Sequence, residues 1–277
     1  MILDGRHSKK VILDELREKV DLLVKKPKLV VIQVGNDEAS NVYIKQKINM
    51  CEYVGYLHEH IKLDEDVTTG IVLDIINRLN NDNSVSGIMV QLPLPKHIDV
   101  DRVINAISYL KDVDGLTDIN NGKLFHGKDS LYSCTPYGIM ELLDRNNISV
   151  CSKNVVIVGR SNLVGKPMAM MFLDRDASVS ICHSKTKNLS EYTRKADILV
   201  VAVGKANFIT DDMVSDGVIV IDVGINRLGD MLCGDVSYDT VSKKCSYITP
   251  VPGGVGQMTV AMLATNILKA YNLQNKK

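Results

Sequence analysis

The chain has 277 residues, of which 45% are hydrophobic and 24% are charged, and its 33 basic residues balance its 33 acidic ones. That length allows about two domains, and the neutral charge gives no electrostatic support for binding nucleic acid or an anionic membrane surface. No apolar run approaches the ~20 residues that span a bilayer. The six cysteines are dispersed without metal-ligand spacing, so we expect a reduced, cytoplasmic protein with no metal site.

Strands and helices alternate in the first half of the chain. Apolar residues at helical spacing predict a helix over 10–26, and the run LVVIQV predicts a buried strand over 29–34. The further expected elements are a helix from about Ser40, a strand over 58–63, a helix over 69–79 and a strand over 87–95 that two prolines end. This alternation predicts a parallel sheet with both faces covered.

The second half repeats the alternation. The expected elements are a helix that starts near Pro136, strands at 155, 177–182, 196–203 and 217–224, a helix over 164–173 and a last helix over 258–271. The series predicts a nucleotide-binding fold of the Rossmann type. We therefore expect an α/β protein with an N-terminal domain over 1–133 and a second domain over 134–257. The last helix, within 258–277, could complete the first domain.

The run VVIVGRSNLVGKP, over 155–167, is typical of a strand, a glycine-bearing turn and a helix start. Such a turn directs backbone N–H groups and the positive end of a helix dipole at a phosphate. Gly159 and Gly165 permit close backbone approach, and Ser161 stands where a second glycine is expected. About 150 residues precede this turn, which indicates that they form a domain with a role of its own.

The segment CHSKT, over 182–186, lies where an acidic residue would bind the ribose of NAD, but it contains no acid. His183, Ser184 and Lys185, together with Arg160, could instead accept a 2′-phosphate. The segment favours NADP over NAD, and the alternative is an ordinary polar strand end.

Tyr43 and Lys47 lie four residues apart on an expected helix, so both project from one face. A lysine that loses its hydration can carry protons near neutral pH, although most lysines on helices are solvated charges. Gln91 ends the strand in GIMVQLPLP, where parallel sheets bind ligands, or it could simply cap the strand. Asp114 precedes a glycine in KDVDGLT, where a turn role is the alternative.

The loop VPGGVGQMT, over 251–259, has three glycines within four residues, more than a turn requires. It could lie flat against a ligand, with Thr259 capping the helix that follows. Taken in order, ASNVYIKQK, GIMVQLPLP, KDVDGLT, GRSNLVGKP and VPGGVGQMT give the chain a resemblance to bifunctional methylenetetrahydrofolate dehydrogenase/methenyltetrahydrofolate cyclohydrolase. The resemblance covers nearly the whole chain, because the five motifs extend from residue 39 to residue 259.

The resemblance implies an enzyme of one-carbon metabolism with a folate-handling N-terminal domain, an NADP domain and a cleft between them. It makes Lys47 the catalytic lysine, which Gln91 assists, while Tyr43 stacks on the folate and Asp114 anchors the pterin. The implied substrate contacts further include Ser40, Pro252, Gly253 and Gly254. The implied cofactor contacts are Gly159, Arg160, Ser161, Ser184 and Ile225. The resemblance also implies a homodimer joined through the NADP domains.

Two residues depart from the family pattern: Gln257 and Ser133 both stand where proline is usual. Gln257 could loosen a loop that touches both ligands, which leaves the balance of the two activities open. The expected reaction is oxidation of 5,10-methylenetetrahydrofolate with NADP, followed by hydrolysis of the methenyl product to 10-formyltetrahydrofolate. The alternatives are a dehydrogenase alone, a cyclohydrolase alone, or a non-catalytic NADP-binding protein.

Overall fold

The polypeptide folds as two α/β units in the computed structural model, which describes residues 1–229 and 231–275. One unit comprises Lys10–Cys134 and Val260–Lys277, and we call it the lysine unit because it contains Lys47. The other comprises Met1–Lys9 and Thr135–Thr259, and we call it the glycine-loop unit because it contains Gly159. The end of the chain therefore belongs with the N-terminal α/β segment, and its first nine residues belong with the nucleotide-type strands.

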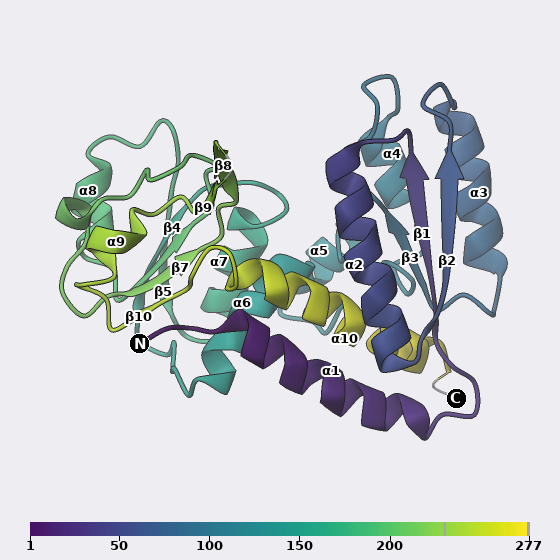
Figure 1. Cartoon of the computed structure of the whole chain (residues 1–277), viewed down its shortest axis with the longest axis horizontal. Helices are drawn as coiled ribbons and strands as arrows, with labels where there is room; N and C mark the ends of the chain where they lie inside the picture. The colour runs from purple at the N-terminus through teal and green to yellow at the C-terminus, as the bar shows by residue number, and fades with distance from the viewer. Residues whose placement is uncertain (230, 276–277) are drawn as a thin grey trace. The chain divides into compact units, whose positions relative to one another are not determined.

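The lysine unit is built on a three-stranded parallel sheet in the order β2-β1-β3. The strands are β1 (Lys28–Val34), β2 (Leu57–Leu63) and β3 (Gly87–Val90). Its helices include α2 (Glu38–Val54), α3 (Thr69–Asn81), α4 (Val100–Asn105) and α5 (Asp118–Phe125). In Figure 1, α2 lies over one face of this sheet, and α3 and α4 lie over the other. The predicted parallel sheet with both faces covered is confirmed.

Alternation along β1 explains that layering. Val30, Ile32 and Val34 point to one face and pack with Val72 and Ile76 of α3 in a buried cluster. Each fully buried aliphatic side chain of this kind contributes about 1.5–3 kcal/mol relative to exposure. The central strand is thus held by apolar burial, which leaves the carboxyl ends of β1 and β3 free to carry polar side chains.

The first helix differs from its prediction at both ends. Helix α1 covers Gly5–Asp21, whereas the apolar spacing predicts 10–26. The earlier start is explained by a cap: the Asp4 carboxylate accepts the N–H groups of Arg6 (2.8 Å) and His7 (3.1 Å). Such a cap satisfies donors that the first helical turn leaves unpaired, and periodicity does not detect it.

The glycine-loop unit has a five-stranded parallel sheet in the order β10-β7-β6-β4-β5. Its strands are β4 (Asn154–Val158), β5 (Ser178–Cys182), β6 (Ile198–Val201), β7 (Ile219–Asp222) and β10 (Tyr247–Ile248), and β8 (Asn226–Leu228) pairs with β9 (Met231–Cys233) as an antiparallel hairpin. The chain leaves β4 toward β5 and then returns to β4's other side with β6. That reversal makes the carboxyl ends of β4 and β6 the place where a doubly wound sheet binds its ligand.

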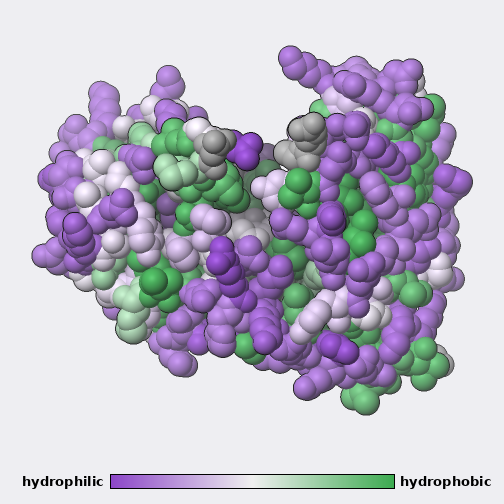
Figure 2. Space-filling view, in the orientation of Figure 1, coloured by the Kyte–Doolittle hydropathy of each residue, from purple (hydrophilic) through white to green (hydrophobic). Residues whose placement is uncertain are grey.

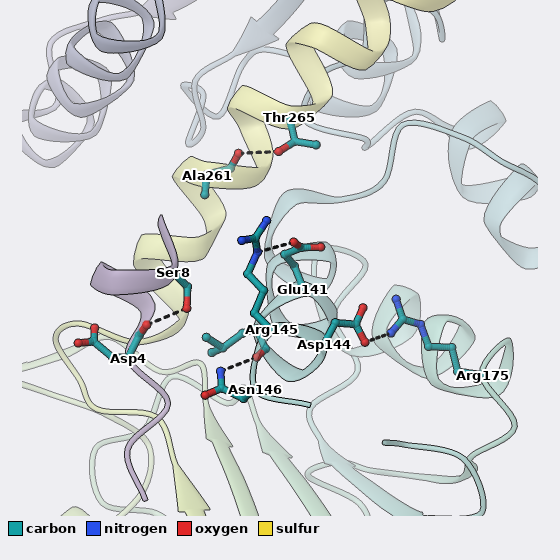
Figure 3. A network of polar contacts seen from close by, with 10 residues as sticks. Asp4, Ser8, Glu141, Asp144, Arg145, Asn146, Arg175, Ala261 and Thr265 are labelled. Atoms are coloured by element: carbon teal, nitrogen blue, oxygen red, sulfur yellow. Dashed lines mark hydrogen bonds and ion pairs between the residues drawn. The ribbon is translucent and has the colours of Figure 1, made fainter. Parts of the chain in front are cut away.

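The two longer helices in this part of the chain are α6 (Cys134–Arg145) and α7 (Gly165–Leu173). The short elements are α8 (Leu189–Thr193), α9 (Tyr238–Val241) and a 3₁₀ turn, η1 (Asp211–Met213). Figure 3 shows the polar contacts of α6. Asp144 of α6 pairs with Arg175, just beyond α7, at 2.5 Å, and Glu141 pairs with Arg145 within α6 at 2.6 Å. The first of these contacts ties α6 to the end of α7.

The last helix, α10, covers Val255–Asn275 and so begins earlier than predicted. Thr259 consequently lies inside the helix and does not cap it; its Oγ1 shares a 3.0 Å hydrogen bond with Thr135 Oγ1. The face of the molecule in Figure 2 is mainly hydrophilic, and its hydrophobic residues form separate patches. Within the described ranges, no helix combines the length and apolar character needed to cross a membrane.

Candidate active site

Helix α2 places Lys47 inside the lysine unit. Asp37 caps the helix by accepting the N–H of Ser40 at 2.8 Å. Lys47 lies on the buried face, with 9% of its surface exposed, whereas Tyr43, one turn earlier, is 44% exposed. The predicted pair therefore has a buried ammonium group and a phenol ring that a ligand can reach.

Lys47 is held by Gln91, which comes directly after β3. The Lys47 Nζ donates a 2.7 Å hydrogen bond to Gln91 Oε1, and Gln91 Nε2 donates to the Leu92 carbonyl at 2.6 Å. The Gln91 backbone N–H also donates to Ile32 at 2.8 Å, which extends the pairing with β1. Because the amide nitrogen is engaged, the amide oxygen faces the lysine.

Burial shifts the pKa values of the charged groups at this point. Burial lowers the pKa of Lys47, and nearby Asp114 and Cys134 act in the opposite direction. Burial also raises the pKa of Asp114, while Lys47 opposes that rise. Both shifts favour the neutral forms, so the site can exchange protons more readily than an exposed lysine and aspartate.

The two aspartates of KDVDGLT have different roles. The Asp112 carboxylate accepts the N–H groups of Leu116 (3.1 Å) and Thr117 (2.9 Å) and the Nδ2 of Asn120 (2.9 Å). It is committed to folding its own loop. Asp114, two residues on, is the member of the pair whose charge interacts with Lys47. The structure thus brings together Lys47, Gln91 and Asp114.

Two residues beside Asp114 were not predicted from the sequence to belong to the site. Cys134 is buried, its Sγ donates to the Val113 carbonyl at 3.4 Å, and burial raises the pKa of its thiol well above the usual value. Asn266 of α10 donates through Nδ2 to the carbonyls of Val113 (2.9 Å) and Tyr132 (2.8 Å). Asn266 thereby holds the loop that carries Asp114. No signal in the sequence links residues 153 positions apart.

Ser40 has a structural contact of its own. Its Oγ donates to Asp37 Oδ2 at 2.8 Å, next to the backbone hydrogen bond that caps α2. The hydroxyl oxygen can still accept a hydrogen bond from a ligand. Its role as a substrate contact stays a prediction.

The glycine turn after β4 is a tight cradle. Gly159 has φ 133°, and a Cβ there would lie 2.3 Å from the Ala202 carbonyl oxygen. A Cβ on Gly165, the first residue of α7, would lie 2.2 Å from the Gly159 carbonyl oxygen. Ser161 Oγ accepts the Val164 N–H at 3.1 Å and so shapes the turn. Only glycines allow this approach, which fits a phosphate-binding turn.

The segment after β5 forms a small polar turn beside that cradle. Thr186 Oγ1 accepts the His183 N–H at 2.9 Å, and His183 Nδ1 accepts the Lys185 N–H at 3.2 Å. Ser184 and Arg160 are exposed. An exposed hydroxyl, cationic neighbours and no carboxylate within 182–186 suit a 2′-phosphate better than a bare ribose.

The remaining predicted residues also lie in the glycine-loop unit. Ile225, after β7, is 51% exposed. The loop over 252–254 is closed by the Gly254 N–H, which donates to Pro250 at 2.8 Å. The loop belongs to the glycine-loop unit, whereas Lys47 belongs to the lysine unit. Gln257, the departure from proline, accepts a 3.3 Å hydrogen bond from Lys9 Nζ.

No cluster of three or more His, Cys, Asp or Glu side chains suited to a metal ion occurs among the residues that the structure describes.

Comparison with known families identifies two domains of one family. Residues 3–114 match the model of the tetrahydrofolate dehydrogenase/cyclohydrolase catalytic domain, and residues 133–275 match the model of the NAD(P)-binding domain of the same family. The chain belongs to the tetrahydrofolate dehydrogenase/cyclohydrolase family. The resemblance and the two-domain α/β fold inferred from the sequence are confirmed.

Individual members of this family are similar over the whole chain. The bifunctional protein FolD of Acholeplasma laidlawii is 51% identical over 278 residues, which cover 100% of both chains. A crystal structure of the bifunctional enzyme FolD from Campylobacter jejuni has a TM-score of 0.97 and 48% identity, over 99% of each chain. The Trypanosoma brucei methylenetetrahydrofolate dehydrogenase-cyclohydrolase, complexed with NADP cofactor and inhibitor, has a TM-score of 0.95 and 34% identity, over 100% of this chain and 99% of that one.

Proposed function

We propose that the protein oxidises 5,10-methylenetetrahydrofolate to the methenyl compound with NADP and hydrolyses that compound to 10-formyltetrahydrofolate. The observation that carries the proposal is the buried pair of Lys47 and Gln91 with Asp114 beside it, in a chain that also has the glycine cradle. The bifunctional relatives support both activities, and the Trypanosoma brucei complex supports NADP as the cofactor.

The glycine cradle fits NADP. Gly159 and Gly165 leave no room for side chains, so the backbone and the first turn of α7 would hold the diphosphate. Arg160, Ser161 and Ser184 would hold the adenosine half, and Ile225 would border the nicotinamide. When bound, NADP supplies the nicotinamide ring that accepts a hydride. The protein's contribution to that step is positioning.

Hydrolysis of the methenyl compound requires proton transfer. A water molecule attacks the methenyl carbon and loses a proton. As the ring then opens, a folate nitrogen gains a proton and the former water oxygen gives up its second one to become the formyl oxygen, so that one proton is released overall. Lys47 is the group suited to these transfers, because burial lowers its pKa and Gln91 fixes its position. We assign Tyr43 to stacking on the folate, since its ring is exposed one turn from Lys47. Asp114 and Ser40 are assigned to polar contacts with the substrate, and the loop over 252–254 to its outer part.

We further propose that the protein is a cytoplasmic homodimer. The six cysteines are all free thiols, in keeping with a reducing compartment. Strand β5 is the outer strand of its sheet and exposes 40% of Ile181, which supports association through the glycine-loop unit. Analytical ultracentrifugation tests the dimer: a sedimentation coefficient of a 30.6 kDa monomer at micromolar concentration would contradict it.

One spectrophotometric assay tests both activities. The enzyme is mixed with 5,10-methylenetetrahydrofolate and either NADP or NAD, and methenyl absorbance is followed over time. We expect methenyl formation and decay together, with faster formation with NADP. Formation without decay would indicate a dehydrogenase alone. NADP binding without any folate-dependent change would indicate a non-catalytic protein.

A further inference from the structure

Two carboxylates are buried at the carboxyl edge of the larger sheet, in the glycine-loop unit. Asp222 ends β7 and is 3% exposed, and Asp235, which follows β9, is 0% exposed. A buried carboxylate is unfavourable unless hydrogen bonds replace its hydration. The partners of these two groups therefore indicate what the pair is built to hold.

Asp235 accepts the N–H groups of three successive residues. Val203 donates at 2.7 Å, Gly204 at 2.9 Å and Lys205 at 2.8 Å, and Asn226 Nδ2 adds a fourth bond at 2.8 Å. Successive N–H groups that converge in this way form a nest that binds anions. In this protein the nest after β6 is filled by an internal carboxylate, so these donors are committed within the unit.

Asp222 holds Asp235 in place. It accepts the N–H groups of Gly224 (3.0 Å), Asp235 (2.9 Å) and Val236 (2.9 Å). Burial raises the pKa of Asp222 to about 6, and its hydrogen bonds act against that rise. At neutral pH it is therefore the carboxylate that accepts these three bonds.

Two glycines show how closely the network is packed. A Cβ on Gly224 would lie 2.2 Å from Asp235 Oδ1, and a Cβ on Gly234 would lie 1.8 Å from Asp222 Oδ2. The backbone thus approaches both carboxylates at distances that no side chain permits. The network connects the loop after β6, the loop after β7 and the segment after β9.

Ile225 lies between two anchored residues. Gly224 before it is bound to Asp222, and Asn226 after it is bound to Asp235. Yet Ile225 itself is 51% exposed, three residues beyond the end of β7, which is the neighbour of β6 in the sheet. A hydrophobic residue that is exposed but rigidly held is suited to contact with the face of a planar ring.

We propose that Asp235, supported by Asp222, is a positioning residue that sets Ile225 and the loop over 203–205 to hold the nicotinamide half of NADP. This inference rests on the proposed binding of NADP and extends it. The two parts of the cofactor differ in the contacts they require. A diphosphate requires N–H donors, which the turn at Gly159 to Gly165 directs at it. The N–H groups of the β6 loop are already bound to Asp235, so that loop borders the nicotinamide ring.

The test is Asp235→Asn, which keeps the shape but replaces one acceptor oxygen by a donor that would face N–H groups. Binding of NADP is compared with binding of adenosine 2′,5′-bisphosphate, which has the adenosine half and the 2′-phosphate but no nicotinamide. We expect NADP to bind about tenfold more weakly, since tenfold corresponds to the loss of roughly one good hydrogen bond. The bisphosphate should bind as it does to the wild type.

The matched control is Asp197→Asn. Asp197 also accepts a backbone N–H, from Asn154 at 2.7 Å, but at the amino end of the sheet. It should bind both ligands like the wild type. Hydrolysis of the methenyl compound should persist in Asp235→Asn, because Asp235 lies in the glycine-loop unit and Lys47 in the lysine unit.

Two results would overturn the inference. Asp235→Asn could bind NADP normally, or it could weaken both ligands equally, as a purely structural role requires. If Asp235→Asn does not fold, Asn226→Ala can be used instead, because it removes one of the four hydrogen bonds to Asp235. This variant should also bind NADP more weakly, to a smaller degree, and bind the bisphosphate normally. Equal binding of NADP to Asn226→Ala and to the wild type would count against the proposal. Wild-type protein that binds NADP but leaves folates unchanged would contradict the proposed function and not this inference.

Discussion

Gly165→Ala tests the glycine cradle. The added Cβ would lie 2.2 Å from the Gly159 carbonyl oxygen and 2.7 Å from its carbon, and both atoms belong to the backbone. Relief of the clash requires roughly 1 Å of separation between the turn and α7, because non-bonded carbons rest at about 3.5 Å or more. Overpacking of this kind costs about 1–3 kcal/mol, whereas alanine in a helix gains at most about 1 kcal/mol over glycine.

The clash should therefore prevail. We expect a lower melting temperature and NADP binding weakened about tenfold, as a loss of about 1.4 kcal/mol gives. The assays are thermal unfolding and calorimetric titration with NADP. Gly122→Ala is the matched control: Gly122 lies within α5, and a Cβ there would meet nothing within 4 Å. It should be neutral or stabilising. A Gly165→Ala variant with wild-type melting temperature and NADP affinity would refute the reasoning.

Three further predictions concern the chemistry. Gln91→Leu leaves Lys47 without its amide acceptor in a buried site, which costs about 1–3 kcal/mol. Steady-state cyclohydrolase turnover should therefore fall about ten- to hundredfold. An unchanged rate would contradict a catalytic role for the hydrogen bond between Lys47 and Gln91. Burial lowers the pKa of Lys47, and the neutral amine is the form that acts as a base. Cyclohydrolase activity should therefore rise with pH and level off below the ordinary pKa of lysine. Activity that does not change with pH below that pKa would exclude Lys47 as the base. Ser184→Asp places a carboxylate at the position that we assign to the 2′-phosphate of NADP. The carboxylate would repel that phosphate and could bind the ribose hydroxyl of NAD, so the ratio of kcat/KM for NADP to that for NAD should fall. An unchanged ratio would show that the 2′-phosphate does not bind at Ser184.

Much of the fold follows from local patterns. The buried strands over 29–34 and 155–158 are apolar runs, and apolar burial fixes both their positions and their pairing. Helix ends were less predictable because polar caps decide them. Asp4 starts α1 five residues before the apolar spacing indicates, and α10 begins at Val255 inside a segment that reads as a glycine-rich loop.

The site was predictable where it depends on spacing within one element. Tyr43 and Lys47 share a helix, so their four-residue separation was informative. The contact of Lys47 with Gln91 joins residues 44 positions apart, and only tertiary folding brings them together. Likewise, the sequence does not distinguish Asp112 from Asp114, because the difference is which of them finds backbone donors. The Asp222 and Asp235 network lacks any local pattern at all.

Lys47→Met gives the most direct test of the central claim, that one lysine manages the protons of the hydrolytic step. The substitution keeps the length and apolar stem of the side chain and removes the amine. Turnover of 5,10-methenyltetrahydrofolate, measured above its uncatalysed hydrolysis, should fall by about 10²-fold or more, the usual contribution of general acid–base catalysis. NADP affinity should be unchanged, because the cradle belongs to the other unit. Hydrolysis at the wild-type rate in this variant would contradict the account.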